Sequence, residues 1–492
     1  MDQYILSIDQ STSTTKALLF DKKGKLFRRS DTSHRQLIDE KGWVEHDPLE
    51  IYANLLHAVK SVIHESGIST KQIVGASISN QRETSLAWNR ETGEPVYNAI
   101  VWQCGRGEAI CKRLERHKTF IKERTGLNLS PYFSAAKFAW ILENVPKAQE
   151  LAREKHLVCS TIDSWLVKRL TVEHSVLTEY SNASRTQLFN INTLDWDRDV
   201  CSLFGLSPEM LPPVHPSDSL FGYTDFGGIF DDPIPLHGVL GDSHGALFAQ
   251  GCLQPGMVKA TYGTGSSIMM NIGDRPIFCK DLVTSLAWGL EGNIQYVLEG
   301  NINYSGATIT WLVDDLQLLG SAREVEALAS KAKPVPGLYL VPAFSGLGAP
   351  YWEGNARAMV CGMNRTTGKA ELVRAAEESI GYQIADIIEL MKKESGYSVP
   401  LLKVDGGATR DAFLMQFQAD ILQSTISIAS LEELSGQGAA FACGLALGFY
   451  EKSKIFPVLG KHTFKPIMKE AERDCLYQGW QKAISCTLSY GC

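Results

Sequence analysis

The sequence predicts an α/β protein made of two domains of near-equal size. Strand-like apolar runs alternate with helical stretches along the chain, a pattern typical of α/β folds. A chain of 492 residues is also too long for a single hydrophobic core. Two similar segments, residues 5–20 and 257–270, lie roughly 250 residues apart, and such a repeat indicates an internal duplication.

Each of these two segments predicts a strand, a turn rich in small hydroxyl residues, and a second strand. The expected strands are Ile5–Ile8 and Ala17–Phe20 in the first segment, and Met257–Ala260 and Ile268–Met270 in the second. Backbone N–H groups and hydroxyls in such turns suit phosphate oxygens, so the pair predicts a clamp on a nucleotide's phosphates. Two ordinary hairpins are the alternative, and for either segment alone it is the better interpretation. Asp9 in the first turn and Gly263 and Gly265 in the second favour the phosphate clamp over two ordinary hairpins.

Other elements follow from apolar spacing and capping residues. A helix is expected over 49–63, opened by Asp47 and Pro48, and a buried strand over 73–79. Further helices are expected over 370–391 and 436–448, and a strand over 401–404 precedes a helix that begins near Asp411. The interruption at 251–256 predicts a boundary, which gives domains over 1–250 and 251–492.

Composition excludes several function classes. The net charge of −7 argues against a nucleic-acid or anionic-membrane partner. The 11 cysteines form no C-x-x-C pair, which favours reduced thiols over disulfides or a zinc site. No signal peptide is evident, and the longest apolar run, 438–450, is too short to span a bilayer. We expect a soluble cytoplasmic protein.

Two carboxylates follow predicted strands. Asp9 could hold Mg²⁺ through water while the turn binds phosphate, although an aspartate that only stabilises the turn is the alternative. Asp242 follows the apolar run 234–240 and is suited to act as general base on a hydroxyl in phosphoryl transfer. His244 offers a second base, but a lone histidine more often packs or hydrogen-bonds.

Two further groups complete the predicted chemistry. The glycines that follow the strand ending at Val404 allow close approach of adenine or ribose, although a plain strand-to-helix turn explains them equally well. No Walker loop and no G-x-G-x-x-G after a strand is present to bind the phosphates instead. Arg82, Glu83, Trp102 and Tyr132 suit a hydroxylated substrate, the alternative being a surface ion pair beside a core Trp.

The residues resemble the FGGY family of carbohydrate kinases, and within it most closely the glycerol kinases. The resemblance covers nearly the whole chain and includes the stretches 4–10, 42–48, 80–84, 98–104, 181–186 and 346–352. Residues 132–144 fit the family's first motif, and residues 358–378 fit the second except at Glu377, where the family prefers an apolar residue. The resemblance implies two actin-like ATPase (ribonuclease H-like) domains around a central cleft that binds ATP and Mg²⁺.

The resemblance also implies roles for individual residues. Asp242 would be the catalytic base, and Asp9 would be associated with Mg²⁺. The acceptor would be held by Arg82, Glu83, Trp102, Tyr132 and Asp242. The nucleotide would be bound by Thr12, Ser13, Lys16, Thr264, Gly265, Gly306, Gly407 and Ala408. The rival function is an actin-like ATP switch, which has no need of a polyol pocket.

Departures from the glycerol kinase pattern bear on the substrate. Ser243 replaces a Gln, and Ser267 replaces a Phe that packs on the glycerol carbons. A wider and more polar pocket is expected, and we hypothesise a four- or five-carbon polyol or ketose such as xylulose. A strict glycerol kinase is the alternative.

On the nucleotide side, Thr310 and Asp411 replace a Gln and an Asn, which puts those contacts in doubt. The sequence leaves the oligomeric state open; a homodimer and a homotetramer are both compatible with it.

Overall fold

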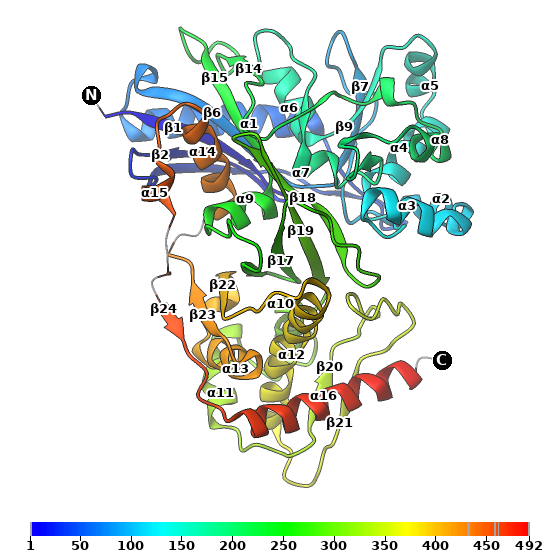
Figure 1. The fold of residues 1–492 in the computed structure, drawn as a ribbon, viewed down its shortest axis with the longest axis vertical. Coiled ribbons are helices and arrows are strands. Elements are labelled where there is room, and N and C mark those ends of the chain that lie inside the picture. The colour runs from blue at the N-terminus through cyan, green and yellow to red at the C-terminus, as the bar shows by residue number, and fades with distance from the viewer. Residues whose placement is uncertain (1, 431–432, 457–458, 461, 491–492) are drawn as a thin grey trace.

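The computed structural model describes residues 2–430, 433–456, 459–460 and 462–490 and shows two lobes, each built on its own large β-sheet (Figure 1). The first sheet has the strand order β14-β15-β6-β1-β2-β3, and the second has the order β18-β19-β17-β16-β22-β23-β24. A five-stranded sheet, β4-β5-β8-β7-β9, lies in the first half of the chain. The predicted α/β fold is confirmed.

The bounds of the elements are as follows. The first sheet comprises β1 (Tyr4–Gln10), β2 (Thr14–Phe20), β3 (Leu26–Ser33), β6 (Ile73–Asn80), β14 (Gly222–Thr224) and β15 (Ile234–Gly241). The second comprises β16 (Val258–Tyr262), β17 (Ser266–Gly273), β18 (Val283–Leu290), β19 (Asn293–Ile302), β22 (Leu401–Gly406), β23 (Thr425–Ile428) and β24 (His462–Phe464). The five-stranded sheet comprises β4 (Leu37–Ile38), β5 (Val44–His46), β7 (Ser85–Asn89), β8 (Ala99–Ile100) and β9 (Leu157–Thr161). Short pairs are formed by β10 (Thr178–Glu179) with β13 (Val214–His215), β11 (Phe189–Asn190) with β12 (Asp195–Trp196), and β20 (Tyr339–Val341) with β21 (Met359–Cys361).

Helices connect and cover these strands. In the first half they are α1 (Pro48–Ser66), α2 (Glu108–Arg113), α3 (Lys118–Thr125), α4 (Ser134–Asn144), α5 (Pro146–Arg153), α6 (Ile162–Leu170), α7 (Tyr180–Ala183), α8 (Arg198–Leu203) and α9 (Asp242–Ala249). In the second half they are α10 (Gly306–Thr310), α11 (Val325–Lys331), α12 (Lys369–Ser395), α13 (Ala412–Leu422), α14 (Leu434–Ala446), α15 (Lys452–Ile455) and α16 (Glu470–Tyr490).

The two large sheets repeat one topology. In the first sheet β1, β2 and β3 pair antiparallel in turn, and β1 pairs in parallel with β6, which pairs in parallel with β15. In the second sheet β16, β17 and β19 form the antiparallel part, and β22 and β23 form the parallel part. Each copy begins with one of the two predicted hairpins. The predicted internal duplication is therefore confirmed in the strand order, although the halves share little residue identity.

Helix α14 comes late in the chain but packs on the first sheet. It contacts β1, β6 and β15 and lies beside α9 (Figure 1). Phe441 and Cys443 of α14 are buried in one cluster with Ile5 and Leu240 of the first lobe. The lobes are thus joined by more than one crossing of the chain, and the boundary near residue 250 stays a prediction.

Local signals account for the ends of the predicted helices. The Asp47 side chain accepts a hydrogen bond from Leu49 N at 2.8 Å and caps α1. Helix α12 begins one residue before the predicted range and ends four residues after it, and Gly396 in the left-handed conformation ends it. Helix α14 begins at Leu434, two residues before the predicted start.

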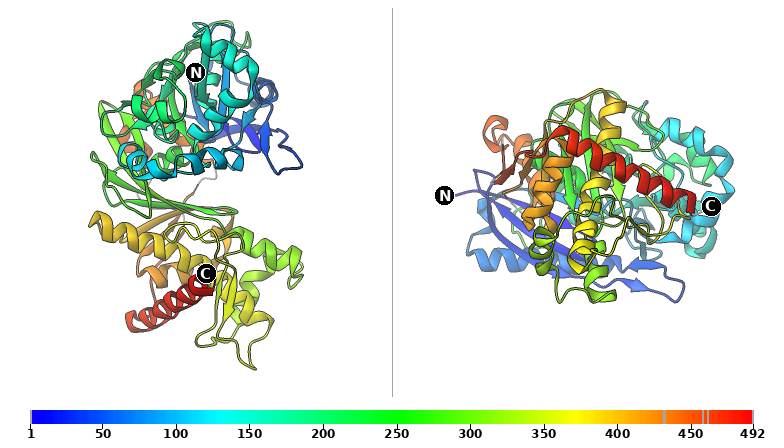
Figure 2. Two further views of the ribbon diagram at one scale, coloured as in Figure 1. Left: turned by 90° about the vertical axis from the view of Figure 1, so that its right-hand side faces the viewer. Right: turned by 90° about the horizontal axis from the view of Figure 1, so that it is seen from below.

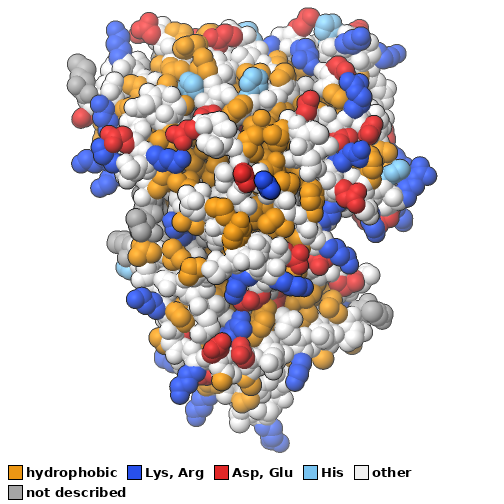
Figure 3. Space-filling model, in the orientation of Figure 1, with side chains coloured by type: hydrophobic (Ala, Val, Ile, Leu, Met, Phe, Trp, Pro, Cys, Tyr) orange, Lys and Arg blue, Asp and Glu red, His pale blue; other side chains and the backbone are white. Residues whose placement is uncertain are grey.

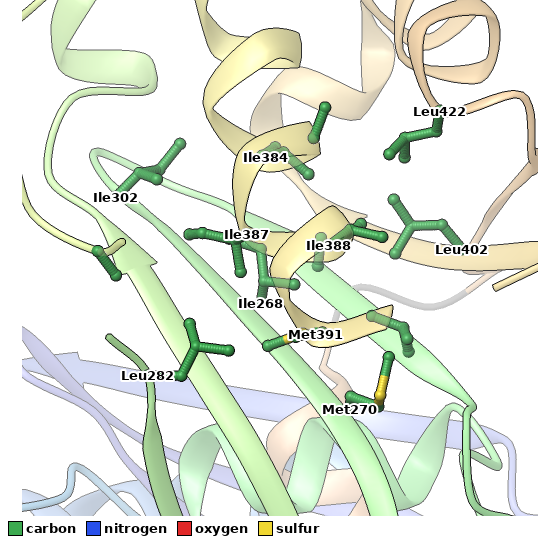
Figure 4. Packing of buried hydrophobic residues seen from close by; sticks show 14 of the residues in the cluster. Ile268, Met270, Leu282, Ile302, Ile384, Ile387, Ile388, Met391, Leu402 and Leu422 are labelled. Atoms are coloured by element: carbon green, nitrogen blue, oxygen red, sulfur yellow. The ribbon is translucent and has the colours of Figure 1, made fainter. Parts of the chain in front are cut away.

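The second sheet forms the side of the second lobe that faces the first lobe, and α12 covers its other face (Figures 1 and 2). Ile268 and Met270 of β17 and Ile302 of β19 point toward Ile384, Ile387, Ile388 and Met391 of α12 (Figure 4). Because side chains alternate along a strand, the residues between them face the first lobe. Apolar side chains also gather across the middle of the visible face, between the lobes (Figure 3).

The ten described cysteines are all free, as predicted. No helix among the described residues has the length and apolar character needed to cross a membrane.

Candidate active site

Three parallel strands end side by side at the cleft edge of the first sheet. Gln10 of β1 is the register partner of Asn80 in β6, and Asn80 is the partner of Gly241 in β15. The carboxyl ends of neighbouring parallel strands are where ligands bind in open α/β sheets. The strand register therefore brings the predicted residues Asp9, Arg82 and Asp242 to one edge, although they are far apart in the sequence.

Asp9 lies inside β1 and not in the turn, which corrects the expectation from the sequence. The turn is closed by Ser11, whose N–H donates to Thr14 O at 2.9 Å and whose Oγ accepts from Thr14 N at 3.2 Å. The alternative role of Asp9 as a turn-stabilising residue is therefore wrong. Its carboxylate is buried, and Oδ1 has no hydrogen-bond partner among the described residues. Burial raises the pKa of Asp9 to about 6, against the opposing effect of Lys16.

Lys16 lies between two carboxylates beside the first hairpin. Its Nζ is 2.6 Å from Glu433 Oε2 and 3.8 Å from Asp9 Oδ2. Glu433 also pairs with Arg29 at 2.5 Å and immediately precedes α14, so the returning segment of the chain holds this lysine in place. At the tip of the hairpin Ser13 is exposed and Thr12 is half-buried.

The second hairpin docks against the start of α10. Gly306 N donates to Gly263 O at 3.0 Å, and Ser305 N and Ala307 N donate to Thr264 O at 3.0 and 2.9 Å. Gly265 lies so close to β19 that a Cβ on it would come within 2.4 Å of Ile302 O. The predicted residues Thr264, Gly265 and Gly306 are thus brought together, with Thr310 exposed on α10.

A cavity of about 880 Å³ lies between the two lobes, beside several of the residues predicted to bind the nucleotide. It is lined by Lys16 and Glu433 on one side and by Gly406, Gly407 and Arg410 on the other. The register pair Tyr262 and Gly406 sets the glycine loop beside the second hairpin. Of the predicted nucleotide residues, Lys16 and Gly407 line this cavity, and Ala408 is partly buried next to Gly407.

Two carboxyl groups meet where the sequence departs from the family pattern. Asp411 caps α13 by accepting a hydrogen bond from Leu414 N at 3.0 Å. Glu377 of α12 is buried, and burial together with the neighbouring Asp411 raises the pKa of Glu377 to about 10. The raised pKa favours the uncharged form of Glu377 beside Asp411.

Asp242 is the first residue of α9, directly after β15, as predicted. Its Oδ1 lies 3.2 Å from Arg82 Nε and accepts a hydrogen bond from Ser243 N at 2.6 Å. Oδ2 accepts no hydrogen bond from any described residue, and a third of the side chain is exposed. One oxygen is thus held in place while the other remains available to accept a proton.

A buried glutamate that sequence reasoning missed connects this site. Glu299 of β19 accepts hydrogen bonds from Arg82 Nη1 at 2.9 Å and Nη2 at 3.1 Å, and it lies 2.9 Å from Arg185 Nη1. Arg185 Nε in turn donates to Glu83 Oε1 at 2.6 Å. Although burial opposes its ionisation, the two arginines lower the pKa of Glu299 far below its usual value. The sequence signal that could have revealed it is a glutamate that directly follows two apolar residues, Val297 and Leu298, in a strand-like run.

Arg82 and Glu83 are buried, and Glu83 pairs with Arg185 and not with Arg82. The alternative of a surface ion pair is therefore wrong. Trp102 is half-buried, and its ring centroid lies 5.5 Å from that of Tyr132. The Trp102 Nε1 donates a hydrogen bond to Thr12 Oγ1 at 3.0 Å. This bond connects the residues predicted to hold the acceptor with the first hairpin.

The remaining predicted residues occupy distinct positions. Burial raises the pKa of Tyr132 well above its usual value, so it stays a neutral phenol. Ser267 lies on β17, and its hydroxyl is buried without a described partner. Burial lowers the pKa of His244, which lies 3.4 Å from Ser285 Oγ, and this supports the packing role over that of a second base.

A duplicated sheet with a phosphate-type hairpin in each copy is the arrangement that the actin-like ATPase fold requires. The buried polar residues beside Asp242, among them Arg82 and Glu299, match what a carbohydrate kinase of that fold needs next to its general base. Comparison with family models agrees: residues 4–249 match the N-terminal domain, and residues 258–447 the C-terminal domain, of the FGGY family of carbohydrate kinases. The chain belongs to this family and is an ATP-dependent kinase.

Individual relatives cover nearly the whole chain. Glycerol kinase 2 of Thermotoga maritima is 44% identical over 99% of both chains. The crystal structure of Plasmodium falciparum glycerol kinase with ADP is 32% identical, with a TM-score of 0.93 over 99% of this chain and 98% of that one. A xylulose kinase from Lactobacillus acidophilus, 21% identical with a TM-score of 0.87 over 98% of both chains, shares the fold.

Proposed function

We propose that the enzyme transfers the γ-phosphoryl group of ATP to a terminal hydroxyl of a small polyol or ketose, with Asp242 as the general base. The observation that carries the proposal is the state of the Asp242 carboxylate. Oδ1 is fixed by Arg82 and Ser243, and Oδ2 is without a described donor. A positioned carboxylate that takes the proton of the attacking hydroxyl is the group that phosphoryl transfer requires.

The acceptor would bind between the N-terminal lobe and β17. Trp102 and Tyr132 offer aromatic surface for the C–H side of a polyol, and Arg82 offers donors to its hydroxyls. As the Asp242 carboxylate takes the proton, the hydroxyl oxygen attacks the γ-phosphorus in line, and the bond to the β-phosphate oxygen breaks. Lys16 and the N–H groups of both hairpins would offset charge on the phosphates.

The residues fit the Mg²⁺ that the family implies. Mg²⁺ takes oxygen ligands and keeps several waters, so one or two carboxylates suffice beside the phosphates. Asp9 Oδ1 is a buried oxygen without a described partner, and the charge of Asp242 acts on Asp9. Asp9 would hold the ion, directly or through water, and the ion would neutralise charge on the transferred group.

The acceptor is proposed to be longer than glycerol, with four or five carbons, as in xylulose. Ser267 supports this because a small hydroxyl side chain stands where an aromatic wall would shorten the pocket. A strict glycerol kinase is the second candidate, favoured by the 44% identical relative of that name. A coupled ADP-release assay over three- to five-carbon polyols and ketoses decides between them. The highest kcat/KM for glycerol would reject the longer acceptor.

The role of Asp242 has its own test. We expect Asp242→Asn to lower kcat by about 10²- to 10⁴-fold, while the melting temperature stays close to that of the wild type. Asp231→Asn, on an exposed loop of the same lobe, is the matched control and should leave kcat unchanged. Near-normal turnover of Asp242→Asn would reject the base. An actin-like switch would instead be stabilised by nucleotide alone and by no acceptor in a thermal-shift assay.

A further inference from the structure

A polar patch on β17 and β19 faces the first lobe. Ser267 of β17 is the register partner of Asn301 in β19, and Met269 is the partner of Glu299. Side chains directly opposite each other in an antiparallel pair lie on the same face of the sheet. Ile268, Met270 and Ile302 point into the core under α12 (Figure 4), so Ser267, Asn301 and Glu299 lie on the opposite face.

This face of the sheet contacts the first lobe, including Arg82, one of the residues predicted to hold the acceptor. Met269 and Val297 pack with Leu240 and Phe248 of the first lobe, and Glu299 binds Arg82. Asn301 Nδ2 donates to Glu299 Oε1 at 3.1 Å. Asn301 is therefore one hydrogen bond away from the glutamate that holds Arg82, which itself holds the Asp242 carboxylate.

The chemistry of Asn301 fixes which of its atoms remains available. A carboxylate accepts hydrogen bonds and cannot donate, so the amide nitrogen of Asn301 must face Glu299. The carbonyl Oδ1 then points away from Glu299 and takes no hydrogen bond from any described residue. Asn301 is only partly buried, and Ser267 Oγ beside it also has no described partner. The Asn301 carbonyl oxygen and the Ser267 hydroxyl thus lie on neighbouring strands, and neither has a hydrogen-bond partner among the described residues.

We propose that Asn301 is a specificity-determining residue of the acceptor site. Together with Ser267 it binds a hydroxyl on the fourth or fifth carbon of the acceptor, a group that glycerol lacks. Glu299 positions both halves of the site, since it holds Arg82 with its two oxygens and Asn301 with one of them. This inference rests on the proposed function and adds the residue that would discriminate acceptor length.

The test compares kcat/KM for glycerol, erythritol, xylitol and D-xylulose in the wild type, Asn301→Ala and Ser267→Ala. Loss of one hydrogen bond to a substrate hydroxyl lowers kcat/KM by about tenfold. We expect this loss for the four- and five-carbon acceptors that the wild type uses best, and a change of less than about twofold for glycerol. Asn293→Ala, at the exposed far end of β19, is the matched control and should leave every ratio unchanged.

A purely structural role would give a different result. If Asn301 only supports Glu299, Asn301→Ala lowers kcat/KM equally for all acceptors, and the proposal is overturned; an unchanged ratio in both variants overturns it as well. Should Asn301→Ala prove unstable by its melting temperature, Ser267→Ala alone decides, because that side chain bonds to no described residue. A wild type that phosphorylates none of the acceptors overturns the proposed function too, whereas an active wild type with unaltered ratios in the variants overturns this inference alone.

Discussion

Replacing Glu299 by glutamine tests the charge network under the acceptor site. Glu299 is fully buried and satisfies three hydrogen bonds, two from Arg82 and one from Asn301, besides its ion pair with Arg185. Glutamine keeps one acceptor oxygen and turns an NH₂ group toward a guanidinium. Removing one partner of a buried ion pair costs about 3 to 5 kcal/mol, because the remaining charge stays desolvated.

Thermal denaturation measures this cost. For a folding unit the size of one lobe, a loss of 1 kcal/mol in the free energy of unfolding lowers the melting temperature by about 2 to 4 °C. We therefore expect the melting temperature of Glu299→Gln to fall by about 6 to 20 °C. The KM for the acceptor should rise as well, because Arg82 loses one of its two hydrogen bonds to residue 299, while the KM for ATP changes less.

Glu291→Gln is the matched control for this experiment. Glu291 pairs with Lys452 at 3.1 Å on the surface, at the turn before β19. An exposed pair of this kind contributes less than about 1 kcal/mol. If Glu299→Gln lowers the melting temperature no more than Glu291→Gln does, the reasoning about the buried network is refuted.

Three further predictions follow from single contacts. Glu377→Gln should stabilise the protein relative to the wild type by an amount that grows as pH rises from about 5 to 9. The folded pKa of Glu377, about 10, lies above the ordinary value of 4.5, so the stability of the wild type falls over this range by roughly 1 kcal/mol per pH unit at most. A difference in melting temperature that does not grow with pH contradicts this. Gly265→Ala should weaken ATP binding more than tenfold in a calorimetric titration, because its Cβ would lie 2.4 Å from a backbone oxygen. The control Gly263→Ala, whose Cβ would meet one oxygen at 3.2 Å, should bind ATP more nearly normally. Equal affinities of the two variants would contradict the clash. Trp102→Phe keeps an aromatic ring but loses the hydrogen bond to Thr12, so KM for both substrates should rise about fivefold, and an unchanged KM for ATP would show that this contact does not couple the two sites.

Local patterns predicted most helices and strands, but not every residue that belongs to them and not the partners of their side chains. The two hairpins, the long helix α12 and the position of Asp242 at a strand end were accessible because strand and helix periods are properties of neighbouring residues. Asp9 was predicted in the turn because the strand continues for two polar residues, Asp9 and Gln10, which resemble the start of a turn. Arg82 and Glu83 were predicted as a pair, but their partners come from β19 and from the segment after α7.

The sequence by itself determined the fold class, the two phosphate-type hairpins and the family, because these depend on short runs of residues and on motifs in chain order. Only the tertiary structure decided the strand order of the two sheets, the return of α14 to the first lobe, and the pairing of Glu433 with Lys16. It alone placed Glu299 under Arg82 and Asn301 opposite Ser267. The physical reason is that these contacts join residues distant along the chain through strand register and helix packing, and no spacing within the sequence encodes which distant residues will meet.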